Sequence, residues 1–171
     1  MEHSDISGMR KRLMGEETLV SKELPGEIDI AGLALFAYSS EDADYPMEHL
    51  IDGLRGPGGT RWASARPNTT ERIVLAFDPA QRISGLAYEV EECRQERTQE
   101  VHVEVSTDHG HSYRQVLVQE YTFSPQGSTF QQEDLRLDLT DVTHLGLTIV
   151  PSKRGSGVAT LTSLRVFALR A

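Results

Sequence analysis

The chain has 171 residues, a length that suits one domain with a substantial hydrophobic core. Its 17 Lys and Arg residues against 26 Asp and Glu residues give a formal net charge of −9. Such a charge repels nucleic acids and anionic membranes, so we expect neither as a partner. Cys93 is the single cysteine, which excludes a disulfide within the chain and favours a reducing compartment.

The first 28 residues mix charges of both signs with scattered apolar positions and show no helical periodicity. This stretch also lacks the apolar core of a secretory signal, and no later run is long enough to span a bilayer. We therefore interpret residues 1–28 as a tail or docking segment and residues 29–171 as one domain, and we expect a cytoplasmic protein.

From Ile30 onward, short apolar or alternating runs are separated by turn residues about every ten positions, which is typical of an all-β sandwich. Alternation is clearest at Val101, Val103 and Val105, where one face of a strand is expected in the core and the other in water. Only one helical turn is expected, at residues 46–51. The predicted strands, eight as in a jelly roll, are residues 33–38, 72–77, 82–90, 100–106, 113–121, 135–139, 144–150 and 161–169.

The most informative segment is residues 37–64. It contains the pair Ser39-Ser40, then Leu-Ile-Asp-Gly at 50–53, then Thr60, Trp62 and Ser64 at alternate positions. This order resembles the opening of the coagulation factor 5/8 type C (discoidin) domain and of the related family 32 carbohydrate-binding modules. The later runs follow in the order of that family, so the resemblance covers roughly residues 30–171.

The resemblance implies an eight-stranded antiparallel jelly-roll sandwich of the galactose-binding-domain-like kind, whose loops at one end bind a ligand without catalysis. In those families the tryptophan at the position of Trp62 is mostly structural, so we expect it in the core rather than stacked on a sugar.

Members of the carbohydrate-binding branch often hold a structural calcium, which the resemblance would assign to Asp52 and Thr60. The glutamate that completes the family's set should fall near Ser163, so this chain lacks that carboxylate. The alternative interpretation is that Asp52 only caps its own turn.

Residues 106–113, Ser-Thr-Asp-His-Gly-His-Ser-Tyr, fit the pattern of an Asp-box hairpin. Asp108 can accept bonds from nearby backbone N–H groups and Gly110 tolerates a positive φ, so this motif is expected to be structural. His109 and His111 lack a third ligand at metal spacing and are interpreted as solvated.

Candidate ligand contacts are polar side chains in the loops at the Ser64 end of the sandwich. Arginine suits bidentate pairing, and a loop site depends on a few convergent polar groups, although each such side chain alone could be a solvated charge. The candidate set is Arg61, Arg66, Asn68, Lys153 and Arg154.

No nucleophile, zinc-protease or phosphate-binding motif is present, and the paired acids Glu91-Glu92 are interpreted as solvent-facing at a strand end, so we do not expect an enzyme. Two functions stay open. The resemblance favours a carbohydrate-binding module. The alternative is an intracellular protein-interaction module on the same fold without a sugar or calcium site, with Tyr121, Phe123 and Phe130 supplying the apolar surface.

Overall fold

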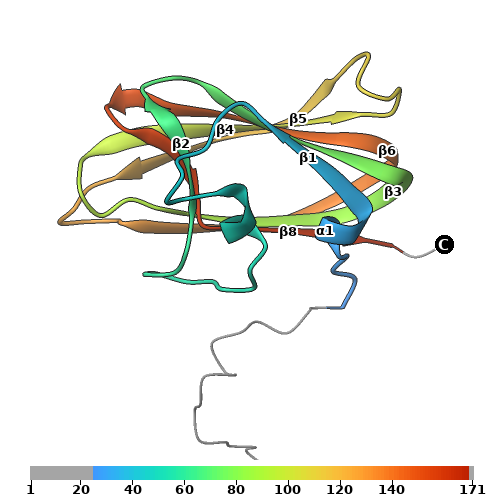
Figure 1. The fold of residues 1–171 in the computed structure, drawn as a ribbon, viewed down its shortest axis with the longest axis horizontal. Helices are drawn as coiled ribbons and strands as arrows, with labels where there is room; N and C mark the ends of the chain where they lie inside the picture. Colours follow the sequence, from blue (N-terminus) through green and yellow to red (C-terminus); the bar gives the residue numbers. More distant parts are fainter. Residues whose placement is uncertain (1–24, 170–171) are drawn as a thin grey trace, which may run out of the picture.

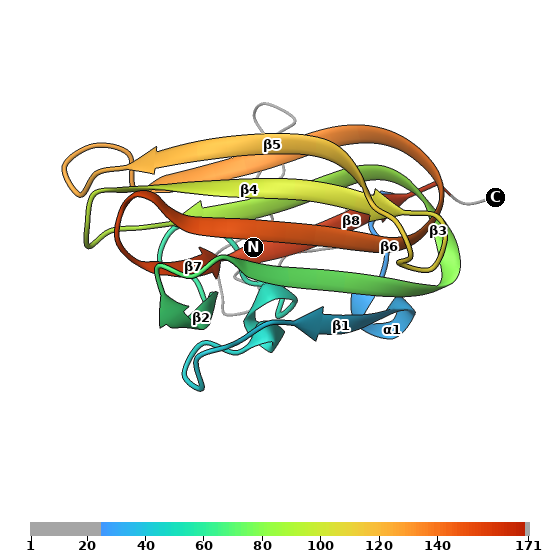
Figure 2. The ribbon, with the colours of Figure 1, turned by 90° about the horizontal axis from the view of Figure 1, so that it is seen from above.

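A computed structural model of the protein describes residues 25–169. They form an antiparallel β-sandwich of eight strands with a 3-10 turn within residues 46–51, as the sequence predicted, and with one short helix at Ile30–Leu33 that was not predicted. Figure 1 shows the two layers and Figure 2 the same fold from above. The elements are α1 (Ile30–Leu33), β1 (Ala34–Tyr38), η2 (Met47–Leu50), β2 (Trp62–Pro67), β3 (Glu71–Glu91), β4 (Arg97–Ser106), β5 (Arg114–Phe123), β6 (Phe130–Gly155), β7 (Val158–Leu161) and β8 (Ser163–Ala168).

Two long strands, β3 and β6, run through both layers. The first part of β3 pairs with β1 and with residues 144–149 of β6, and β4 and β5 extend that layer on the far side of β6. The second part of β3 pairs with β8 and with residues 130–139 of β6. The ladder between β3 and β6 is irregular between Ala76 and Gly85, where the strands bend from one layer into the other.

These bends explain where the predicted strands differ from the observed ones. Residues 72–77 and 82–90 are two parts of β3, and residues 135–139 and 144–150 are two parts of β6, because the turn residues between them bend the strand without ending it. The predicted strand at residues 161–169 is divided at Thr162 into β7 and β8, and β2 was not predicted as a strand.

The core lies between the two layers and follows the alternation seen in the sequence. In β4, Val101, Val103 and Val105 are buried while His102 and Glu104 between them are partly exposed. The same alternation in the first part of β3 buries every second residue from Ile73 to Phe77. Burial of these side chains is the main stabilising contribution to the sandwich.

The N-terminal part of the described chain lies along the edge of β8. Glu27 forms a bridge with Phe167, the Ile28 N–H donates to the Val166 carbonyl at 3.0 Å, and the Ala168 N–H donates to the Gly26 carbonyl at 2.8 Å. Residues 26–28 therefore pair with the sandwich. The rest of the predicted tail, residues 1–24, lies outside the described residues. Within residues 25–169 no helix is long and apolar enough to cross a membrane.

Candidate functional site

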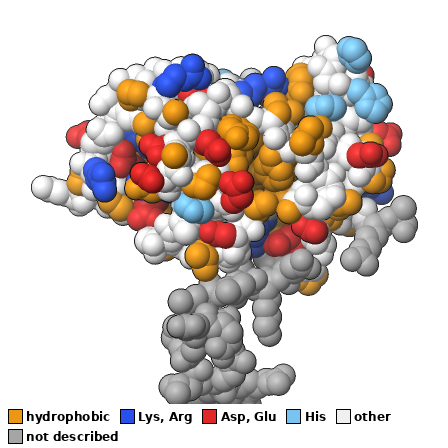
Figure 3. Space-filling view, viewed as in Figure 1, with side chains coloured by type: hydrophobic (Ala, Val, Ile, Leu, Met, Phe, Trp, Pro, Cys, Tyr) orange, Lys and Arg blue, Asp and Glu red, His pale blue; other side chains and the backbone are white. Residues whose placement is uncertain are grey.

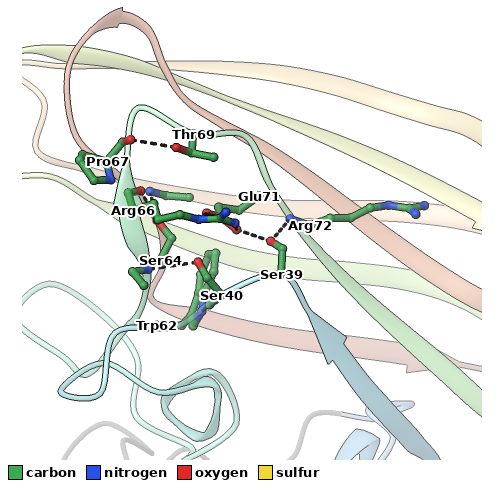
Figure 4. A network of polar contacts seen from close by, with 11 residues as sticks. Ser39, Ser40, Trp62, Ser64, Arg66, Pro67, Thr69, Glu71 and Arg72 are labelled. Atoms are coloured by element: carbon green, nitrogen blue, oxygen red, sulfur yellow. Dashed lines mark hydrogen bonds and ion pairs between the residues drawn. The ribbon is translucent and has the colours of Figure 1, made fainter.

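Trp62 is a core residue, as the sequence predicted. Its side chain is fully buried, and the indole N–H donates to the Ser40 carbonyl oxygen at 3.1 Å. Its own carbonyl accepts from the Thr160 hydroxyl at 2.7 Å, which ties β2 to β7. Figure 4 shows Trp62 beside Ser40 in a network of polar contacts. A sugar cannot stack on a ring that is fully buried.

Arg66 is held by a buried carboxylate. The Glu71 side chain is fully buried and accepts from Arg66 Nε and Nη2, both at 3.3 Å. Ser39 also donates its hydroxyl to Glu71 and accepts from the Arg72 N–H at 2.8 Å (Figure 4). Arg66 neutralises the buried Glu71, and this network links β2 to β3 and to the end of β1. The guanidinium of this predicted ligand residue is therefore already paired within the protein.

Asn68 joins the end of β2 to the turn between β6 and β7. Its backbone is left-handed, with φ of 55°. The Asn68 Oδ1 accepts from the Gly157 N–H at 2.9 Å, and the Asn68 N–H donates to the Gly157 carbonyl at 2.8 Å. The side-chain amide nitrogen of Asn68 makes no hydrogen bond to any described residue. The side chain therefore makes one structural hydrogen bond and keeps an N–H donor that can bind a ligand.

Lys153 and Arg154 lie near the end of β6 and do not line the cavities that adjoin Arg61. Lys153 Nζ donates to Glu100 Oε2 at 2.6 Å and also contacts Glu120. The hydrogen bond from Lys153, helped by His102, lowers the pKa of Glu100 to about 2. Arg154 is exposed opposite Thr98. Of the five predicted ligand residues, the structure brings together Arg61 and Asn68.

Two adjoining cavities lie at this end of the sandwich, and we call them together the loop-end groove. The first, about 360 Å³, lies between the β3–β4 loop and the β6–β7 turn, and the second, about 390 Å³, lies beside the glycine-rich loop. Arg61 and Glu91 line both. Asn68, Arg94, Gln95 and Gly157 line the first cavity, and Tyr45, His49, Gly58 and Thr60 line the second.

A buried charge pair stabilises the base of the first cavity. Arg97 is 2% exposed, and it donates from Nε to Glu92 Oε1 at 2.8 Å and from Nη1 to the Pro151 carbonyl at 2.8 Å. Burial lowers the pKa of Arg97, Glu92 opposes that shift, and the nearby charge of Arg61 adds to it. The expectation that the Glu91-Glu92 pair faces solvent is wrong for Glu92, which is buried because it neutralises Arg97.

Two carboxylates from β3 fix the glycine-rich loop that forms the wall of the second cavity. Glu89, which is 4% exposed, accepts from the Gly56 N–H at 2.8 Å, and Glu91 accepts from the Gly58 N–H at 2.9 Å. Sequence reasoning missed both roles. The signal available in the sequence was their spacing, because residues two positions apart on a strand project from the same face.

The residues expected to bind calcium do not fit that ion. Thr60 donates its hydroxyl to Asp52 Oδ2, and the Leu54 N–H donates to Oδ1 at 2.9 Å, so Asp52 caps its own turn. The cavity between Asp52 and Ser163, about 250 Å³, is also lined by Arg55 and Arg165. Two guanidinium groups oppose a cation, and residues 25–169 hold no cluster of three or more His, Cys, Asp or Glu suited to a metal.

The Asp-box turn is structural, as predicted. Asp108 accepts from the Ser112 hydroxyl at 2.6 Å and from the Ser106 hydroxyl at 2.7 Å, and these bonds hold the pKa of the carboxyl well below its usual range. His109 and Gly110 both adopt positive φ in this turn. The turn connects β4 to β5 at the end of the sandwich opposite the loop-end groove (Figure 2).

The apolar surface predicted around Tyr121, Phe123 and Phe130 is not exposed. Tyr121 is 7% exposed and Phe123 is fully buried, because both face the core side of β5, while Phe130 is half-buried. The Tyr121 hydroxyl contacts the Tyr88 hydroxyl at 2.6 Å, and burial raises the pKa of Tyr88 to about 12. A protein-docking surface cannot be built from these residues.

Comparisons with known proteins agree with this architecture. The family model of the F5/8 type C domain matches residues 36–163. Carbohydrate-binding module CBM32-3 from a family 31 glycoside hydrolase of Clostridium perfringens has a TM-score of 0.61 at 17% identity, over 84% of this chain and 96% of that one. The family 32 module of C. perfringens NanJ, solved with galactose, has a TM-score of 0.56 at 14% identity, over 83% and 98%.

A third similar structure is the C. perfringens module CpGH89CBM32-5, solved with GalNAc-β-1,3-galactose. It has a TM-score of 0.57 at 22% identity, over 80% of this chain and 96% of that one. At these identities the solved structures establish the fold alone. No curated protein sequence matches the chain.

Proposed function

This chain belongs to the F5/8 type C domain family, and on that premise we propose that it is a noncatalytic carbohydrate-binding domain that holds a sugar in the loop-end groove. Modules of the same fold have been solved with galactose and with GalNAc-β-1,3-galactose. The groove lies in the loops at one end of the sandwich, where a scaffold of this kind leaves side chains free to bind a ligand.

The observation that carries the proposal is the composition of the groove. Sugars offer many hydroxyl donors and acceptors and some apolar C–H surface. The groove offers the amides of Asn68 and Gln95, the guanidinium of Arg61 and the ring of Tyr45, which lies 4.8 Å from the Arg61 guanidinium carbon. A few convergent polar groups beside an aromatic ring are typical of small-ligand sites.

The groove is also fixed before a ligand arrives. The Asn68–Gly157 bonds hold one rim, and the Glu91–Gly58 bond holds the other. A preformed site loses less conformational entropy on binding, so modest contacts suffice for measurable affinity. The same bonds argue against catalysis, because Glu91 and Glu92 are engaged by backbone N–H groups and by Arg97 and do not form a free acid–base pair.

Isothermal titration of the full chain with a panel of neutral and acidic sugars, including galactose, N-acetylgalactosamine and galacturonic acid, tests the proposal. We expect at least one saccharide to bind and Tyr45→Ala and Gln95→Ala each to weaken that binding about tenfold or more. Arg114→Gln, at the opposite end, is the matched control and should bind as the wild type does. Absence of binding across the panel contradicts the proposal.

A second function is favoured by one observation, an apolar patch on the edge strand β1. Leu35 is 74% exposed and Tyr38 is 45% exposed. Apolar side chains gather in the region of β1 in the view of Figure 3. Such a patch suits a protein partner. If this is the function, L35S/Y38S should abolish a stable complex that wild type forms, while Tyr45→Ala should leave that complex intact.

A further inference from the structure

We propose that the loop-end groove selects acidic saccharides, and that Arg61 and Arg94 bind the carboxylate of the sugar. This inference rests on the proposed function and specifies its ligand class. The basis is the pairing of the charged side chains in the groove, where some arginines have a carboxylate partner and others have none.

Both carboxylates of the groove accept hydrogen bonds within the protein, and one of them is neutralised by a buried arginine. Glu92 accepts from Arg97 Nε at 2.8 Å through one oxygen and from the Arg94 backbone N–H at 3.3 Å through the other. Glu91 accepts from the Gly58 N–H at 2.9 Å and from the Cys93 thiol at 3.2 Å. Glu92 is thus neutralised by Arg97, whereas Glu91 is held by two neutral donors, keeps its negative charge and makes no ion pair with the remaining arginines of the groove, Arg61 and Arg94.

Those arginines have no acidic partner among residues 25–169. The Arg61 guanidinium lies over the Tyr45 ring and makes no ion pair with a described carboxylate. The Arg94 side chain is exposed at the rim and likewise makes no ion pair within the described part of the chain. Arg66 shows the contrast, because it is paired with the buried Glu71 only a few residues away.

The groove is therefore locally positive in a chain whose net charge is −9. Three guanidinium groups, those of Arg61, Arg94 and Arg97, line the first cavity beside the two carboxylates, which leaves one excess positive charge. Arg61 also opposes the charge of the buried Arg97, so an anion placed between Arg61 and the rim would relieve that repulsion.

The arrangement favours a single carboxylate over other anions. One excess positive charge matches a monoanion, and the planar fork of arginine matches the two oxygens of a carboxylate. The neutral part of a sugar acid would find Tyr45, Asn68 and Gln95 beside the charged groups. Uronic and sialic acids share this chemistry.

Titration of the full chain with galacturonic acid and with galactose tests the inference, because the two sugars differ only at C6. We expect galacturonic acid to bind about tenfold tighter or more at low salt, and this advantage to shrink as salt rises because one charge interaction carries it. Arg94→Gln, at an exposed position, and Arg61→Gln should each remove most of the advantage. Arg114→Gln should preserve it, and thermal melting should confirm that all three variants fold.

The outcomes separate this inference from the proposed function. Equal affinity for galactose and galacturonic acid, with both lost in Tyr45→Ala, overturns the acidic selectivity and leaves sugar binding intact. If R61Q/R94Q still binds galacturonic acid more tightly than galactose, these two arginines are not the groups that bind the carboxylate. Equal binding of galactose-6-sulfate overturns the choice of a carboxylate. Absence of binding to every saccharide overturns both proposals.

Discussion

Arg97 carries a buried positive charge beneath the loop-end groove, and Glu92 is the carboxylate that neutralises it. A buried ion pair is costly to break from one side, because the remaining charge stays desolvated without a partner. The side chain also donates to Gln99 and to the Pro151 carbonyl, so its position is fixed by three separate parts of the chain. The groove above it depends on this arrangement.

Replacing Glu92 with glutamine should lower the free energy of unfolding by about 3–5 kcal/mol, because Arg97 would lose its neutralising partner. Urea denaturation of the full chain measures this loss. Glu96→Gln, at an exposed position on the same loop, is the matched control and should change stability by less than about 0.5 kcal/mol. Equal losses in both variants would contradict the structural role of the pair.

Glu100 should make stability depend on pH at the acid end. Lys153 lowers its pKa to about 2, from the ordinary value of 4.5. Because the folded-state pKa is lowered, the stabilisation is fully present above pH 4.5 and is lost as the pH falls toward 2. Glu100→Gln should be less stable than wild type at neutral pH, and the difference should disappear as the pH falls through about 2, in unfolding curves measured across that range. A difference that persists unchanged at the lowest pH would count against this pairing.

At the scale of elements, the turn from β6 to β7 forms one rim of the groove and depends on a glycine. Gly155 has φ of 75°, a conformation that residues with a Cβ rarely adopt. A Cβ at this position would overlap the Glu96 carbonyl oxygen and come within 3.0 Å of Arg97 Cα. The close approach of the β3–β4 loop to this turn is therefore possible only without a side chain.

Gly155→Ala should destabilise the protein by about 1–3 kcal/mol through the positive φ alone, with the overlap adding to that loss. Thermal or urea unfolding measures it, and sugar binding should weaken in parallel because the rim shifts. Gly127→Ala offers a matched control in another turn, where the nearest atom, Ser124 Cβ, lies 3.6 Å from the added Cβ. That variant should be as stable as wild type, and a comparable loss there would contradict the argument.

At the scale of the whole molecule, β3 and β6 connect the layers, and residues 26–28 cover the outer edge of β8. An uncovered edge strand exposes unpaired backbone groups, so this short segment both adds hydrogen bonds and protects the sheet. Its pairing shows that the folded unit includes residues that the sequence pattern assigned to the tail.

A chain of residues 29–171 should therefore be less stable than a chain of residues 25–171, by about 2–4 kcal/mol for the lost backbone bonds and the contact of Ile28. Parallel urea denaturation of the two proteins compares them directly. Equal stability would mean that the segment along β8 contributes nothing to the fold.

Much of the fold could be predicted from local patterns. Alternation at Val101–Val105 identified β4 and its buried face, and the order of motifs around Trp62 indicated the sandwich family. The bends in β3 and β6 could not be predicted, because a turn residue that ends one strand and one that bends another look alike in sequence. Glu89 and Glu91 were missed because their partners lie 33 residues away.

The sequence by itself determined the family, the sandwich class and the structural roles of Trp62 and Asp108, since the first three follow from the order of motifs and the last from local hydrogen bonding. Only the tertiary structure decided which charges are free. Arg66 and Arg61 look equivalent in sequence, but Arg66 neutralises Glu71 while Arg61 lies over Tyr45 in the groove. The reason is that the packing of the strands decides which carboxylate lies next to each arginine, and this placement cannot be read from the residues on either side of the arginine.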